Sequence, residues 1–182
     1  LVHAAAGGVG SFATQLAVMA GARVVGTAAE SNHDYLRELG AEPIAYGDGL
    51  VAAAKALVPD GFDVILDYVG GQAIDTVSDL LRPGGSVVSI ADGRVAGLGG
   101  TYAWVRPDAA ELAELAALAA SGQLKVTVSG VFDLEEAAQA YADLSDGIEA
   151  AAKGAGATFV GPDEAFATDD TTPTQIGGRT VP

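Results

Sequence analysis

The apolar positions of this chain alternate between helical spacing and short continuous runs. Val9, Phe12, Leu16 and Met19 recur every three or four residues, the interval that places side chains on one face of a helix. The pattern therefore predicts a helix over about 9–20, with a short apolar run before it and another after it.

Six short runs rich in apolar residues predict strands. They lie at Leu1–Ala4, Arg23–Thr27, Pro43–Tyr46, Phe62–Val69, Ser86–Ala91 and Val126–Ser129. Helical patterns separate them, at 32–39, 50–58, 72–81, 107–120 and 133–147. This alternation is typical of βαβ units over a parallel sheet. We therefore expect an α/β fold, a doubly wound parallel six-stranded sheet with strand order 3-2-1-4-5-6.

The two ends of the chain depart from this pattern. The first run is too short for a full strand and no Met precedes it, so we expect a truncated first strand in a chain cut from a longer one. From Ile148 onward Ala, Gly, Thr, Pro and Asp dominate, and periodicity is lost. The sequence thus predicts a domain over residues 1–147 and a poorly ordered or atypical tail over 148–182.

Composition excludes several classes of protein. The net charge of −15 argues against partners that present a phosphate backbone or an anionic membrane surface. The chain has no Cys, which excludes disulfides, Cys-ligated zinc and thiolate nucleophiles. No apolar run reaches the roughly 18 residues that a transmembrane helix needs. We expect a cytoplasmic protein with no nucleic-acid partner, no membrane partner and no bound metal.

A glycine-rich turn connects the first strand to the first helix. Gly7, Gly8 and Gly10 lie where a dinucleotide-binding fold places its phosphates, because a pyrophosphate must approach backbone N–H groups at the start of a helix. In the G-x-G-x-x-G pattern the first glycine is replaced by Ala5. The alternative is a tight turn that needs glycine only for packing. The position between a strand and an amphipathic helix favours the nucleotide.

The end of the second strand bears on the choice of cofactor. A site for NAD usually has an acid about 20 residues beyond the glycines, which holds the ribose 2′-hydroxyl. Here the strand ends in Thr27 and two alanines, which leaves space for a 2′-phosphate and favours NADPH over NADH. Glu30 lies close by and no Arg or Lys occurs before Arg37, which argues the other way. The expected partners of the phosphate are Ser31, Asn32 and His33, with Tyr46 alongside.

Other polar residues are weaker candidates. His3 lies in a strand and is expected to pack in the core, and His33 is expected to be a solvated residue at a helix start. Asp67, near the end of a buried strand, has either a functional role or a role in tying a loop. Neither a nucleophile–base pair nor the Tyr-x-x-x-Lys or P-loop motif is present.

A series of motifs in order along the chain is more specific than the glycines alone. They are Val2-His3-Ala4-Ala5-Ala6-Gly7-Gly8-Val9-Gly10, Val25-Gly26-Thr27-Ala28, Leu39-Gly40-Ala41, Asp67-Tyr68-Val69-Gly70-Gly71, Leu81-Arg82-Pro83-Gly84-Gly85, Val105-Arg106-Pro107-Asp108 and Val131-Phe132-Asp133-Leu134-Glu135-Glu136-Ala137. Together they resemble the Rossmann-type NAD(P)-binding domain of the medium-chain dehydrogenases/reductases, in particular the zinc-free quinone oxidoreductase branch. The absence of Cys agrees with that branch.

The resemblance implies NADPH-dependent reduction of a quinone or an α,β-unsaturated carbonyl compound. It implies that Gly7, Gly8 and Val9 meet the pyrophosphate, and that Val69 and Ala91 approach the ribose and nicotinamide. The full candidate set for the cofactor is Ala6, Gly7, Gly8, Val9, Thr27, Ser31, Asn32, Tyr46, Val69 and Ala91. It further implies a homodimer, which we expect to form through the sheet edge at Val126–Ser129.

The resemblance also leaves the function divided between two possibilities. The family places a GroES-like catalytic domain before the first strand, and nothing of that kind is present in this sequence. No catalytic residue can therefore be assigned. The alternative to an enzyme is a non-catalytic nucleotide-binding or interaction module, or one chain of a split enzyme.

Overall fold

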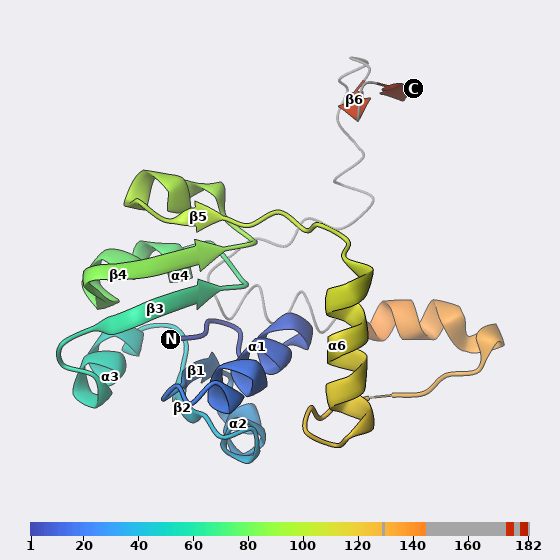
Figure 1. The fold of residues 1–182 in the computed structure, drawn as a ribbon, viewed down its shortest axis with the longest axis horizontal. Coiled ribbons are helices and arrows are strands. Elements are labelled where there is room, and N and C mark those ends of the chain that lie inside the picture. Colours follow the sequence, from blue (N-terminus) through green and yellow to red (C-terminus); the bar gives the residue numbers. More distant parts are fainter. Residues whose placement is uncertain (129, 145–173, 177–178, 182) are drawn as a thin grey trace.

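The structure is a computed structural model that describes residues 1–128, 130–144, 174–176 and 179–181. Parallel strands alternate with helices along most of this length, as Figure 1 shows. The expected α/β class is therefore confirmed.

The strands of the sheet follow the predicted order. β1 (Val25–Ala28) pairs in parallel with β2 (Glu42–Ala45). β3 (Phe62–Asp67) pairs in parallel with β4 (Leu81–Ser89), and β4 pairs in parallel with β5 (Thr101–Tyr102). Val2 joins the two groups, because it forms parallel bridges to Gly26 of β1 and to Leu66 of β3. The first run of the chain thus lies at the centre, with β1 and β2 on one side and β3, β4 and β5 on the other.

The prediction of a sixth strand at Val126–Ser129 is wrong. The part of the predicted strand that the structure describes, residues 126–128, has no regular secondary structure, and β5 is the strand that lies beside β4. Two long-range contacts explain the difference. The Gln15 amide donates to the Lys125 carbonyl and accepts from its N–H, at 3.1 and 2.8 Å, and the Thr127 hydroxyl lies 3.1 Å from the Tyr35 hydroxyl. These contacts hold the segment against two helices. The expected dimer contact through Val126–Ser129 therefore loses its edge strand.

Helices cover both faces of the sheet. The chain runs through α1 (Gly8–Met19), η1 (Glu30–Asn32), α2 (His33–Glu38), α3 (Leu50–Leu57), α4 (Gln72–Asp75), α5 (Val77–Leu80), η2 (Gly93–Leu98), α6 (Ala109–Ala120) and η3 (Leu134–Glu136), after which residues 137–144 are helical. One apolar cluster combines strand residues such as Ile65 with α3, α4 and α5, and a second joins the first run and β1 to α1 and α2. Burial of these two clusters packs the helices onto the sheet, and because the strands are parallel their carboxyl ends meet at one edge.

Acidic residues cap two helix starts. The Asp108 carboxylate accepts from the backbone N–H groups of Ala110 and Glu111 at the start of α6. The Asp133 N–H donates to the Glu136 carboxylate at 3.1 Å, which completes a capping box at η3. The single helix predicted over 72–81 is instead α4 and α5, separated at Thr76.

The predicted domain boundary at residue 147 lies outside the described residues. Within the predicted tail, β6 (Thr174–Ile176) pairs antiparallel with β7 (Arg179–Val181). None of the described helices has the length and apolar character needed to cross a membrane.

Candidate functional site

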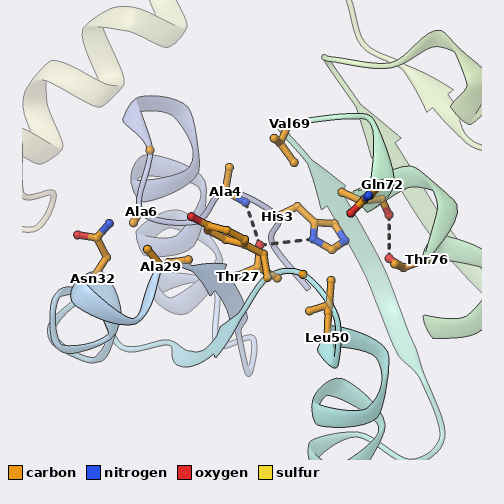
Figure 2. Close-up of a pocket in the computed structure, with 15 residues that line it drawn as sticks. His3, Ala4, Ala6, Thr27, Ala29, Asn32, Leu50, Val69, Gln72 and Thr76 are labelled. Atoms are coloured by element: carbon orange, nitrogen blue, oxygen red, sulfur yellow. Dashed lines mark hydrogen bonds between the residues drawn. The ribbon is translucent and has the colours of Figure 1, made fainter. Parts of the chain in front are cut away.

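A cavity of about 410 Å³ lies at the carboxyl ends of β1, β2 and β3. It opens beside the turn that leads from the first run into α1, and Figure 2 shows the side chains that line it. The lining residues are His3, Ala4, Ala6, Gly7, Thr27, Ala28, Ala29, Asn32, Tyr46, Gly47, Leu50, Val69, Gln72, Ala73 and Thr76. This is the edge at which open α/β sheets bind their ligands.

Two glycines of the turn, Gly10 and Gly8, have different surroundings. Gly10 packs against backbone, since a Cβ at this position would lie 2.1 Å from the Ala4 carbonyl oxygen. Gly8 faces open space, with no atom within 4 Å of the position that a Cβ would occupy. The Gly7 N–H donates to the Ala4 carbonyl at 3.0 Å and closes the turn. The packing explanation therefore applies to Gly10, and the approach of a nucleotide at Gly8 stays a prediction.

The structure brings six of the ten candidate residues to the cavity wall. They are Ala6, Gly7, Thr27, Asn32, Tyr46 and Val69. The other four, which do not line it, are Gly8, Val9, Ser31 and Ala91. Gly8 and Val9 are exposed at the start of α1, Ser31 is exposed beside Asn32, and Ala91 follows β4 on the far side of β3.

His3 is a cavity residue that the sequence assigned to core packing. It is 1% exposed, and its Nδ1 lies 3.5 Å from the Thr27 hydroxyl oxygen, which itself accepts from the Ala4 N–H at 3.1 Å (Figure 2). Burial lowers the pKa of His3 to about 4, against the opposing effect of the negative charge on Asp67. The imidazole is therefore neutral at pH 7. Its other ring nitrogen, Nε2, has no hydrogen-bond partner among the described residues.

The Thr27 hydroxyl is compatible with either tautomer of His3. A hydroxyl oxygen has two lone pairs, so besides accepting from the Ala4 N–H it can donate its hydrogen to Nδ1 or accept from an Nδ1–H. His3 Nε2 lies on the side of the ring away from Thr27, the side on which α4 lies in Figure 2.

The remaining wall comes from residues that sequence reasoning did not select. Leu50 opens α3, and Gln72, Ala73 and Thr76 belong to α4 and the residue after it. The available signal was position for Leu50, Gln72 and Ala73, which lie at helix starts that follow predicted strands, at the same edge as the glycine turn. Thr76 lies at the other end of α4 and has no such signal.

Asp67 ties the ends of β3 and β4 together. Its buried carboxylate accepts from the Ser89 hydroxyl at 2.6 Å and from the Val69 and Gly70 N–H groups at 3.1 and 2.9 Å. The Ser89 oxygen in turn accepts from the N–H groups of Ala91 and Asp92. Of the two roles considered for Asp67, the structure therefore supports loop tying.

Arg94 binds the loop after β3, residues 68–71, from the side of η2. Its guanidinium donates to the Asp92 and Asp75 carboxylates at 2.7 and 2.8 Å and to the Gly71 carbonyl at 2.9 Å. The hydrogen bonds from Arg94 hold the pKa of Asp92 down, at about 2. The loop that contains Val69 is thus fixed from both β4 and η2.

The cavity wall offers hydrogen bonds but no full charge. Neither a carboxylate nor a Lys or Arg side chain is among its lining residues. In the described part of the chain, no group of three His, Cys, Asp or Glu side chains is placed to hold a metal ion. The chemistry available to the wall is backbone N–H groups, hydroxyls, amides and one neutral imidazole, a set suited to orienting a ligand.

The chain is similar to known proteins of one family. The model of a family described as zinc-binding dehydrogenase matches residues 39–150. A quinone oxidoreductase of Pseudomonas aeruginosa is 33% identical over 169 residues, which cover 80% of this chain and 52% of that protein.

Solved structures agree with this match. The quinone oxidoreductase of Coxiella burnetii superposes with a TM-score of 0.71 at 32% identity, covering 80% of this chain and 48% of that one. A mycobacterial protein solved in complex with NADPH superposes with a TM-score of 0.63 at 25% identity, covering 79% and 52%. The chain spans about half the length of these relatives.

Proposed function

Because this chain belongs to the zinc-binding dehydrogenase family, in the quinone oxidoreductase-like branch of the medium-chain dehydrogenases/reductases, we propose that it is the NADPH-binding part of an oxidoreductase. The proposed substrate class is a quinone or an α,β-unsaturated carbonyl compound. The observation that carries the proposal is the cavity itself, which joins the glycine turn to the carboxyl ends of β1, β2 and β3.

The residues present fit a dinucleotide. Open space before Gly8 leaves room for a pyrophosphate at the start of α1, while Thr27, Asn32 and Tyr46 surround the position expected for the adenosine half. The cofactor, when bound, supplies the hydride. The chain's own part is to hold and orient it, and the loop fixed by Asp67 carries Val69 in the cavity wall.

The preference for NADPH over NADH rests on the absence of a carboxylate from the wall. An acid at the tip of β1 would bind the 2′-hydroxyl of NADH and repel a 2′-phosphate. The tip here is Ala28 and Ala29, and the neighbouring cavity residue is the neutral Asn32. The mycobacterial relative that was solved with NADPH supports the same choice.

The proposed reaction uses no zinc, although the matching family is described as zinc-binding dehydrogenase. The sequence has no Cys and two His residues, so it lacks the donors from which zinc sites are usually built. Of these two, His3 is buried beside Thr27, where its Nδ1 faces a hydroxyl. We propose hydride transfer without a metal in this branch.

The second candidate is a nucleotide-binding module that does not catalyse a reaction by itself, or one chain of a split enzyme. The observation that favours it is that no nucleophile–base pair lines the cavity. Turnover of NADPH with a quinone or an enone separates the two candidates, since binding without turnover supports the module. A cytoplasmic location and a homodimer complete the proposal, and sedimentation that shows a monomer at high concentration would contradict the dimer.

The test of the proposed function is a binding titration of the purified chain. We expect NADPH to raise the melting temperature and to change the fluorescence of Trp104, the single Trp of the chain, with a smaller response to NADH. Trp104 is exposed and outside the cavity wall, so calorimetric titration is the primary readout. No response to either cofactor at millimolar concentration by a folded chain would refute the proposal.

A further inference from the structure

A short segment after α6, residues 124–127, is fixed to α1. Leu124 is buried, and the Gln15 amide donates to the Lys125 carbonyl at 3.1 Å and accepts from the Lys125 N–H at 2.8 Å. Gln15 is itself buried, and its NH₂ group also donates to the Ser11 carbonyl at 3.1 Å. Every hydrogen-bonding atom of this amide is therefore used, and the position of the segment relative to α1 is well defined.

The same segment also binds α2. The Thr127 hydroxyl lies 3.1 Å from the Tyr35 hydroxyl. The Lys125 ammonium donates to the Glu38 carboxylate at 3.1 Å and lies 5.9 Å from the centre of the Tyr35 ring. These contacts matter for α2 because this helix is six residues long and has one buried residue, Leu36. A helix with so little buried surface depends on contacts of its outer side chains for its orientation.

α2 begins directly after the turn that we expect to bind the 2′-phosphate. Ser31 and Asn32 belong to η1, which ends where α2 begins, and Asn32 lines the cavity. A shift of α2 therefore moves these two residues relative to the glycine turn at the start of α1. Because residues 124–127 bind both helices, they fix the spacing between the two places at which phosphates of the cofactor are expected.

We infer that Tyr35 is a positioning residue for the 2′-phosphate, acting through η1, and that Lys125 and Thr127 hold it in place. The inference rests on the proposed function and adds a determinant of the choice between NADPH and NADH. NADH has no 2′-phosphate, so loosening α2 weakens the binding of NADPH and leaves the binding of NADH unchanged. A general loss of stability would weaken both.

The inference is tested by calorimetric titration of the 182-residue chain with NADPH and with NADH. Tyr35→Phe and Thr127→Val each remove the hydroxyl contact, and we expect each to bind NADPH about threefold more weakly, with NADH affinity unchanged. The two changes combined should weaken NADPH binding no further, because they remove the same hydrogen bond. Adding Lys125→Met to Thr127→Val removes all three contacts and should weaken NADPH binding about tenfold.

Two further variants separate positioning from a general effect of substitution. Thr127→Ser keeps a hydroxyl and should bind NADPH as the unaltered chain does. Tyr141→Phe is the matched control, since Tyr141 is an exposed tyrosine outside α2 and the segment, and it should change neither affinity.

The outcomes that overturn the inference differ from those that overturn the proposed function. If the unaltered chain binds NADPH, but the variants leave its affinity unchanged or weaken NADPH and NADH by the same factor, the inference is wrong while the proposed function stands. If the folded, unaltered chain does not bind NADPH at millimolar concentration, the proposed function and the inference both fail.

Discussion

The Ser89 hydroxyl donates a 2.6 Å hydrogen bond to the Asp67 carboxylate, and both side chains are fully buried. This bond joins the carboxyl ends of β3 and β4, the edge on which the cavity lies. Because the same carboxylate accepts from the Val69 and Gly70 N–H groups, it holds one wall of the cavity in place. Asp67 thus positions the Val69 wall of the cavity although it does not line the cavity itself.

The first prediction concerns this carboxylate. Asp67→Asn replaces one acceptor oxygen by an NH₂ group in a buried network, so we expect the free energy of unfolding to fall by about 1–3 kcal/mol. Urea denaturation measures the change. The matched control is Asp63→Asn in the same strand, where the carboxylate is exposed and pairs with Arg82, and we expect a change within about 0.5 kcal/mol. Equal losses in the two variants would contradict the role of Asp67.

The second prediction separates the two roles of the glycines. Gly10→Ala forces a Cβ against the Ala4 backbone, so we expect it to destabilise the fold by about 1–3 kcal/mol. Gly8→Ala meets no protein atom and should leave the melting temperature unchanged or slightly raised, yet weaken NADPH binding by occupying the approach to the α1 start. Thermal melts with and without NADPH measure both effects. Unchanged NADPH affinity in Gly8→Ala would place the pyrophosphate elsewhere.

The third prediction is a dependence of stability on pH. The pKa of His3 is about 4 in the folded protein, below its ordinary value of 6.5, so the unfolded chain binds more protons between these two pH values. Stability should therefore rise with pH across this window, be fully present above 6.5, and be lost as the pH falls toward 4. The contribution of His3 is roughly 3 kcal/mol.

The comparison that isolates this effect is with His3→Phe, which shares every acidic group with the unaltered chain. Urea denaturation from pH 4 to pH 7 should give a shallower rise of stability in the variant. Parallel pH profiles would show that His3 is not the group responsible.

The fourth prediction concerns Arg94. Arg94→Met removes the side-chain donor to the Gly71 carbonyl and to the Asp75 carboxylate, while Asp92 keeps the backbone N–H groups of Gly71 and Arg94, and we expect the loop that carries Val69 to loosen. We expect NADPH affinity to fall while the melting temperature changes little, because the Arg94 and Asp75 side chains are exposed. Arg82→Met is the control, since Arg82 pairs with Asp63 away from the cavity. An equal effect on affinity in both variants would contradict the role of Arg94.

Local patterns in the sequence were sufficient for much of the fold and for part of the site. Strand and helix periodicity, the glycine turn and the caps at Asp108 and Asp133 are set by residues a few positions apart, and each is found in the structure. The order of the strands also followed, because right-handed βαβ connections leave few arrangements. Of the candidate site residues at the ends of predicted strands, Thr27, Tyr46 and Val69 line the cavity, and Ala91 does not.

Contacts between distant residues decided the rest. The run at Val126 has the local pattern of a strand, but Lys125 and Thr127 bond to Gln15 and Tyr35, which lie 110 and 92 residues away in the chain. No local pattern records such a partner. His3 reads as a core residue for the same reason, because both burial and an open cavity beside it depend on elements that join only in the tertiary structure. The local patterns thus determined which edge of the sheet carries the cavity, and the packing of α3 and α4 against that edge decided which side chains line it.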